Sequence, residues 1–138
     1  MATIKLYSDL QQSKKLAEIL PLESADMLIL NNTGKSGNID GTNCTTILKE
    51  NLNPLAEVPE ILPCWSLASL LSILPNNENI STNLSKGGYR ISTLEYTNSW
   101  FVEYEDETNG LNNCVTSADN PIDACVAMVE KLHELNLL

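Results

Sequence analysis

The pattern of apolar and polar positions predicts a helix near the start of the chain. Residues 8–11 begin with serine and end with glutamine, the spacing of a capping box in which both side chains satisfy backbone N–H groups. Behind them, Leu16, Ile19 and Leu20 form an apolar stripe at helical spacing. Because proline cannot continue a helix, we expect this helix to end at Pro21.

A second helix is predicted between Trp65 and Pro75. Four leucines recur in it at positions i, i+3, i+4 and i+7, which places them on one face of a helix. This pattern is typical of a helix that packs on the core, and the proline marks its end. The four residues are Leu67, Leu70, Leu71 and Leu74.

The third predicted helix begins at Pro121, a residue favoured at the first helical position. Asn120 or Asp119 can cap it, and Asp123 adds negative charge in the first turn, where the helix dipole favours it. Its apolar residues recur at helical spacing and predict a buried face. They are Ile122, Cys125, Val126, Val129 and Leu132.

The first half of the chain also predicts strands. Residues 26–31 are short and nearly all apolar between polar flanks, which favours a buried strand. Residues 31–43 form a polar, glycine-bearing loop, and a further strand is predicted at 44–49. Prolines punctuate residues 54–63, where we expect an extended connector.

From residue 80 to residue 115, short segments rich in β-branched and aromatic residues predict a meander of three or four strands. Residues 86–88, Lys-Gly-Gly, have the composition of a hairpin turn. Farther on, Trp100, Val102 and Tyr104 alternate with other residues, two of them acidic. This alternation predicts a strand with one apolar face.

The order of these elements places the chain in the α+β class, with about three helices covering one face of a mainly antiparallel sheet. The length of 138 residues is typical of one domain, so we expect residues 1–138 to form a single compact domain. Trp65 and Trp100 are expected to lie in the core, with ligand stacking as the alternative.

The charge balance is strongly acidic. Eighteen Asp and Glu residues against eight Lys and Arg residues give a net charge of −10, which argues against direct binding of nucleic acid or anionic membrane. The apolar stretch at 67–74 is far shorter than the roughly 20 residues that a membrane span needs. Residues 1–15 hold no apolar run typical of a signal peptide, so we expect a cytoplasmic protein.

Side chains suited to catalysis are few. His133 is the single histidine, and we expect it at a packing or oligomer boundary, with a general base as the alternative. Eight residues separate it from Cys125, about 12 Å along a helix, which excludes a direct pair. The remaining cysteines, Cys44, Cys64 and Cys114, show no zinc-site spacing. We therefore expect no enzyme, no metal and no cofactor.

Four acidic residues gather at one predicted strand end and the turn after it. A solvated acidic edge would discourage pairing between molecules. The same cluster could dock on a basic protein surface, or bind a divalent cation for a metal-dependent hydrolase, although its spacing matches no calcium loop. The residues are Glu103, Glu105, Asp106 and Glu107.

Two of the few basic residues flank a glycine-bearing turn. A plain hairpin turn explains this segment, but its cations could also meet phosphate while its tyrosine stacks on a base. Another lysine lies in a Gly-Lys-Ser sequence that lacks the first glycine of a phosphate-binding loop. The candidate contacts for a small anionic ligand are Lys86, Gly87, Gly88, Tyr89, Arg90 and Lys35.

Three segments of the chain resemble a group of phage-borne proteins. Residues 9–27, residues 63–75, and residues 120–125 with 131–134 look like parts of short uncharacterised proteins carried by prophages and mobile elements of gut anaerobic bacteria. The resemblance does not extend to residues 31–58 or 76–116, and it carries over no activity and no catalytic residue. It implies a phage accessory protein in the host cytosol during infection, a gene class in which small binders and inhibitors of host defence are common.

We expect, from these features together, a non-enzymatic binding protein that sequesters or blocks a host component. In the leading hypothesis it is a homo-oligomer whose pockets hold a nucleotide-like defence signal. In the alternative hypothesis its acidic surface inhibits a basic host protein, as a nucleic-acid mimic would. A small metal-dependent hydrolase is the second alternative.

Overall fold

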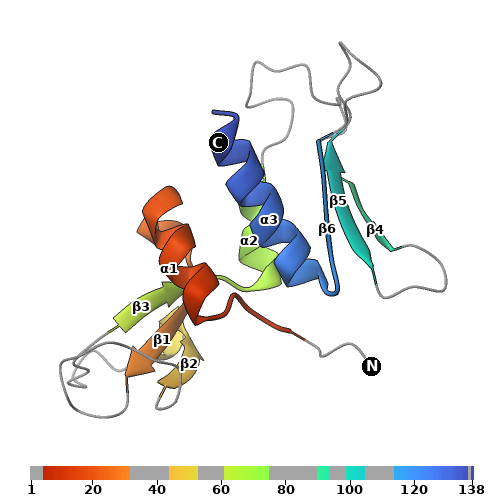
Figure 1. Cartoon of the computed structure of the whole chain (residues 1–138). Helices are drawn as coiled ribbons and strands as arrows, with labels where there is room; N and C mark the ends of the chain where they lie inside the picture. Colours follow the sequence, from red (N-terminus) through yellow and green to blue (C-terminus); the bar gives the residue numbers. More distant parts are fainter. Residues whose placement is uncertain are drawn as a thin grey trace. The chain divides into compact units, whose positions relative to one another are not determined.

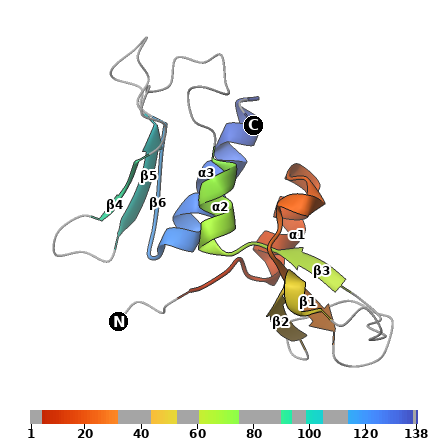
Figure 2. The same cartoon turned by 180° about the vertical axis from the view of Figure 1, so that it is seen from behind.

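The chain has an α+β fold, with three α-helices and two three-stranded antiparallel sheets among the residues that the structure describes (Figures 1 and 2). The computed structural model describes residues 5–31, 44–52, 61–74, 90–93, 99–104, 114–136 and 138. Their contacts divide the chain into two compact units, Tyr7–Ser69 and Met1–Leu6 with Leu70–Leu138. The predicted fold class is confirmed, and the single domain stays a prediction.

The unit Tyr7–Ser69 is built on a sheet with the strand order β2-β1-β3. Both pairs are antiparallel, and the central strand carries the apolar run that predicted it. The helix α1 packs against β3 (Figure 1). The buried side chains of Ile29 on β1 and Cys64 on β3 form a core cluster of this unit. The elements are α1 (Leu10–Ile19), the 3-10 turns Leu22–Ser24 and Lys49–Asn51, β1 (Met27–Asn31), β2 (Cys44–Leu48) and β3 (Ile61–Cys64).

The strand β3 corrects the prediction of a connector through residue 63. Its residues pair with β1, and Pro63 lies opposite Leu28 in the register. Proline cannot donate a backbone hydrogen bond, but the strand order puts β3 at the edge of the sheet, where proline is tolerated. Residues 61–63, predicted as the end of a connector, have the extended backbone that proline favours and belong to an edge strand.

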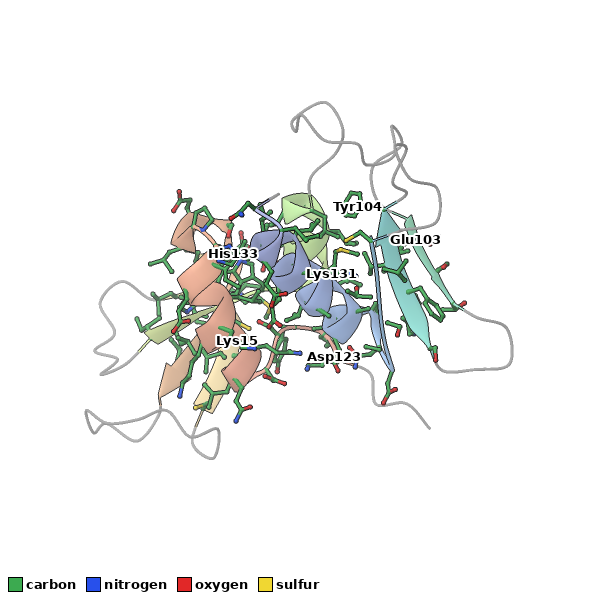
Figure 3. The ribbon with its side chains drawn as sticks, turned by 45° about the horizontal axis from the view of Figure 1, so that its top comes forward. Lys15, Glu103, Tyr104, Asp123, Lys131 and His133 are labelled. Atoms are coloured by element: carbon green, nitrogen blue, oxygen red, sulfur yellow. The ribbon has the colours of Figure 1, made fainter. Side chains whose placement is uncertain are left out.

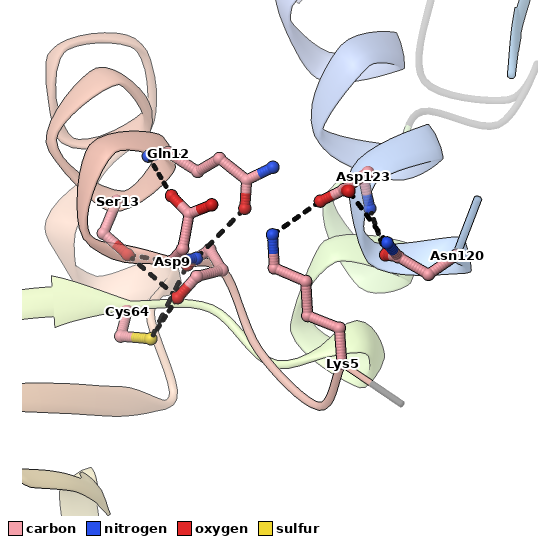
Figure 4. Close-up of polar contacts among 8 residues, drawn as sticks. Lys5, Asp9, Gln12, Ser13, Cys64, Asn120 and Asp123 are labelled. Atoms are coloured by element: carbon pink, nitrogen blue, oxygen red, sulfur yellow. Dashed lines mark hydrogen bonds and ion pairs between the residues drawn. The ribbon is translucent and has the colours of Figure 1, made fainter. Parts of the chain in front are cut away.

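The start of α1 corrects a second prediction, because Asp9 is the cap in place of Ser8. The Asp9 carboxylate accepts a hydrogen bond from the backbone N–H of Gln12 at 2.8 Å, and the Asp9 N–H donates to the Gln12 side-chain oxygen at 3.0 Å. The capping box is thus shifted by one residue (Figure 4). Ser8 is fully buried and bonds elsewhere.

The second sheet has the predicted meander order β4-β5-β6, formed by Arg90–Thr93, Trp100–Tyr104 and Cys114–Ala118. The helix α3 (Pro121–Glu134) packs on β5 and β6 (Figures 1 and 2). Val102 and Tyr104 are fully buried, as the alternation predicts, whereas Trp100 is half-buried.

The helices α2 and α3 agree with the sequence patterns. The helix α2 spans Leu67–Ile73, and Leu70 and Leu74 of its predicted apolar face are buried. Asn120 caps α3 by accepting from the Asp123 N–H, and the Lys5 ammonium pairs with the Asp123 carboxylate at 2.6 Å (Figure 4). None of the helices in the described ranges has the length and apolar character needed to cross a membrane.

The shifted capping box predicts which substitution destabilises α1. Asp9→Ala should lower the free energy of unfolding by about 1 kcal/mol, because the Gln12 N–H loses its acceptor. Gln11→Ala, at the exposed position that the sequence pattern assigned to the box, should change it by less than about 0.5 kcal/mol. Urea denaturation measures both values, and equal effects of the two variants would contradict the assigned cap.

Candidate ligand-binding site

Asp26 lies directly before β1, and its side chain forms hydrogen bonds with Ser66, the residue directly before α2. Its carboxylate accepts one hydrogen bond from the Ser66 backbone N–H, at 2.9 Å, and another from the Ser66 hydroxyl. The two residues are 40 positions apart in the sequence. These bonds fix the direction of a half-buried carboxylate.

Ser66 is itself held by the first turn of α2. Its hydroxyl oxygen accepts from the Ser69 N–H at 3.3 Å, and the Ser69 hydroxyl donates to the Ser66 carbonyl at 3.0 Å. Next to it, the fully buried Trp65 donates its indole N–H to the Ser24 hydroxyl at 3.0 Å. Trp65 is therefore a core residue, as predicted, and it steadies the turn that precedes Asp26.

The hydrogen bonds decide the protonation of Asp26. Burial by itself raises the pKa of the carboxyl group, but the bonds from Ser66 and Ser69 favour the charged form and outweigh it. The pKa of Asp26 is therefore lowered from its ordinary value of 3.8. At neutral pH the group is a fixed negative charge.

Asp26 lines an open cavity of about 480 Å³ together with Leu48, Lys49 and Glu50. The Lys49 N–H donates to the Asp26 carbonyl at 2.9 Å, which brings the end of β2 to the start of β1. The Lys49 ammonium donates to the Ala25 carbonyl at 3.4 Å. All of these residues belong to the unit Tyr7–Ser69, so one small sheet carries the described wall of the cavity.

A second, smaller cavity of about 230 Å³ lies in the same unit beside the start of α1. It reaches the half-buried Cys44 on β2. Its polar groups are uncharged except for Asp9, whose carboxylate caps α1. The lining residues are Tyr7, Ser8, Asp9, Leu10, Ile29, Cys44 and Thr46.

A buried polar cluster connects α1 to β3. The hydroxyl oxygens of Ser8 and Ser13 lie 2.8 Å apart, and the Cys64 thiol donates to the Ser8 carbonyl at 3.3 Å (Figure 4). The Trp65 N–H donates to the Ser8 hydroxyl at 3.1 Å. These groups satisfy one another where water does not reach, which is a structural role.

The buried thiols are poor nucleophiles. Burial raises the pKa of Cys64 and of Cys114, and it raises the pKa of Cys125 to about 11. Because the thiolate is the reactive form, these residues stay protonated and unreactive at neutral pH. His133, expected at a packing or oligomer boundary, is exposed on the last turn of α3 (Figure 3), so it does not pack in the core of this chain, and the oligomer boundary stays a prediction.

The residues predicted for an anionic ligand fall mostly outside the described residues. Arg90 begins β4, and its backbone lies opposite Glu103 of β5 in the register. Glu103 is half-buried on β5 (Figure 3), and it is the described member of the predicted acidic cluster. Lys35, Lys86, Gly87, Gly88, Tyr89, Glu105, Asp106 and Glu107 lie outside the described residues.

The register therefore places one end of the predicted basic turn beside one end of the predicted acidic cluster. From the sequence these are two separate surfaces, since Arg90 and Glu103 are 13 positions apart and only the pairing of β4 with β5 brings them together.

In the described ranges, no group of three His, Cys, Asp or Glu side chains is arranged to hold a metal ion.

The sequence analysis did not single out the residues around the larger cavity. Asp26 begins the predicted apolar strand 26–31, Lys49 ends the predicted strand 44–49, and Ser66 lies at the start of the helix predicted between Trp65 and Pro75. Ser66 does have a local signal, because it lies three residues before Ser69, the spacing at which a serine caps a helix. The partner of that serine across 40 positions has no local signal.

Comparison of the chain with protein-family models, with curated proteins and with solved structures finds no match.

The lowered pKa of Asp26 predicts how stability depends on pH. The folded protein holds this carboxylate charged more strongly than the unfolded chain, so its contribution is complete above about pH 4 and is lost as the pH falls through the lowered pKa. The free energy of unfolding should therefore fall more steeply below pH 4 in the wild type than in Asp26→Asn. Urea denaturation from pH 6 to pH 2.5 measures both, and parallel curves would contradict the assignment.

Proposed function

We propose that the protein is a non-enzymatic binding protein that takes up a small ligand in the cavity beside Asp26 and thereby withholds it. The observation that carries this proposal is the cavity of about 480 Å³, a size within the range of small-molecule sites. Two of its lining residues, Asp26 and Lys49, hydrogen-bond to the protein before any ligand arrives. Such preorganisation lowers the entropic cost of binding.

The chemistry of the neighbouring groups supports binding over catalysis. Asp26 has a lowered pKa and is a weak base at neutral pH, which makes it poorly suited to proton transfer. The raised pKa values of the buried thiols disfavour nucleophilic attack by Cys64. Asp26 and the buried thiols are therefore better suited to maintaining a binding site than to reacting with a ligand.

Binding of a nucleotide-like defence signal stays a prediction, and the residues predicted to contact that signal do not belong to the described lining of this cavity. Two acidic residues, Asp26 and Glu50, and one basic residue, Lys49, line the described part of this cavity. A multiply charged anion would meet net repulsion there. Any phosphate-bearing ligand would therefore use the predicted basic turn that ends at Arg90. The homo-oligomer stays a prediction of the leading hypothesis, and the host cytosol stays a prediction of the resemblance.

A second candidate function is inhibition of a basic host protein by the acidic surface. The net charge of −10 favours it, because complementary charge steers partners together and suppresses wrong ones. In the unit Tyr7–Ser69, Glu18, Glu23 and Glu50 are exposed. The metal-dependent hydrolase remains the third candidate, and loss of an activity in EDTA would favour it.

A capture experiment tests the proposal. The purified protein is incubated with lysate of phage-infected bacteria, recovered, and denatured, and the released small molecules are identified by mass spectrometry. We expect a compound that the wild type releases and that Lys49→Met releases in at least tenfold lower amount. Lys14→Met, an exposed substitution on α1, is the matched control and should release as much as the wild type.

Two outcomes would contradict the proposal. Release of no small molecule together with recovery of a basic host protein, lost at high salt, would favour the acidic inhibitor. Equal release by the wild type and by Lys49→Met would move the binding site away from this cavity.

A further inference from the structure

The strand β6 lies at one edge of the sheet β4-β5-β6. Among the residues that the structure describes, β5 is its one strand neighbour, and the two strands are antiparallel. In an antiparallel pair, every second residue turns its backbone N–H and C=O away from the neighbouring strand. At the edge of a sheet, a row of such outward groups is a template on which a strand of another chain can pair.

The helix α3 packs along β6, and two side-chain bonds show which residues of the strand face it. The Thr116 hydroxyl donates to the Ala124 carbonyl at 2.8 Å, and the Cys114 thiol donates to the Met128 sulfur at 3.7 Å. The side chain of Val115, between them, therefore points to the other face of the sheet. Because the backbone groups alternate with the same period, those of Val115 point opposite to those of Thr116.

A lysine of α3 reaches the backbone of this edge strand. The Lys131 ammonium donates to the Val115 carbonyl at 3.3 Å, across 16 positions of the sequence (Figure 3). Lys131 is half-buried, so the bond lies partly sheltered from water. We propose that the Val115 carbonyl is on the open edge of β6, and that Lys131 closes this edge to pairing with β6 of a second copy of the chain.

The first sheet supports this interpretation by the way it closes one of its own edges. The edge strand β3 carries Pro63, which has no N–H to offer a further strand. Proline and lysine are both residues with which natural sheets prevent pairing at their edges. The strand β6 contains neither a proline nor a charged residue, so its protection has to come from another element. Lys131 of α3 supplies it.

A second copy of β6 is the partner that the strand itself fits. All five residues of Cys114–Ala118 are uncharged in a chain of net charge −10, so two copies of the strand place no like charges opposite each other. A two-fold antiparallel pair centred on Thr116 would set Val115 opposite Ser117 of the second copy. The Val115 carbonyl would then accept from that Ser117 N–H, and this is the acceptor that Lys131 uses in the single chain.

Analytical ultracentrifugation of substituted chains tests the role of Lys131. Lys131→Met removes the donor and keeps an apolar side chain, so its self-association constant at pH 7 should be about tenfold larger than that of the wild type. Lys131→Arg keeps a donor and should associate no more than the wild type. Lys14→Met, an exposed substitution on α1, is the matched control and should also equal the wild type. Circular dichroism checks that each variant is folded.

A proline assigns the association to β6. Ser117 is exposed and shares the backbone direction of Val115, so its N–H faces the open edge, where proline is tolerated. Adding Ser117→Pro to Lys131→Met should return the self-association to the wild-type level. Hydrogen exchange followed by NMR should show a rapidly exchanging Val115 N–H in the wild type, and about tenfold slower exchange in associated Lys131→Met.

Three results would overturn the proposal. If Lys131→Met associates no more than the wild type, Lys131 does not guard the edge. If its association persists with Ser117→Pro, the contact lies on another surface. Slow exchange of the Val115 N–H in the unassociated wild type would show that its backbone groups face β5. None of these results bears on the cavity beside Asp26, which belongs to the unit Tyr7–Ser69.

Discussion

Asp26 joins three parts of the unit Tyr7–Ser69 that are far apart in the sequence. Its carboxylate accepts the N–H and hydroxyl of Ser66, ahead of α2, and its carbonyl accepts the N–H of Lys49, at the end of β2. Because Asp26 itself precedes β1, one residue holds the start of the central strand, the end of its neighbour and the approach to a helix. The described wall of the cavity depends on these bonds, since they set the positions of its charged groups.

The unit Tyr7–Ser69 contains buried polar groups that stabilise the fold and other polar residues that line the larger cavity. The hydroxyls of Ser8 and Ser13 and the thiol of Cys64 are buried and bond to one another or to Ser8, so they are committed to packing. Asp26 and Lys49 line the larger cavity and also hydrogen-bond to the protein itself. Burial keeps the Cys64 thiol protonated, and this supports the proposed binding function over nucleophilic catalysis by that residue.

The sequence was sufficient to predict the elements that depend on contacts between residues close together in the chain. The helical spacing of leucines before Pro75 and the cap and proline ahead of α3 were sufficient, because helices depend on local contacts. The shift of the α1 cap from Ser8 to Asp9 was not visible, since both residues suit a cap and only the burial of Ser8 against Trp65 decides between them. The strand β3 was hidden by its proline, and the bond of Asp26 to Ser66 spans 40 positions.

The central claim is that Ser66 fixes Asp26 as a charged group at the cavity. Carbon-13 NMR of the Asp26 carboxyl carbon, followed from pH 7 to pH 2, measures its pKa in the folded protein directly. The account predicts a midpoint below 3.8, which moves upward in Ser66→Ala because the two hydrogen bonds are weakened or lost. A midpoint at or above 3.8 in the wild type, or one that Ser66→Ala leaves unchanged, would contradict it.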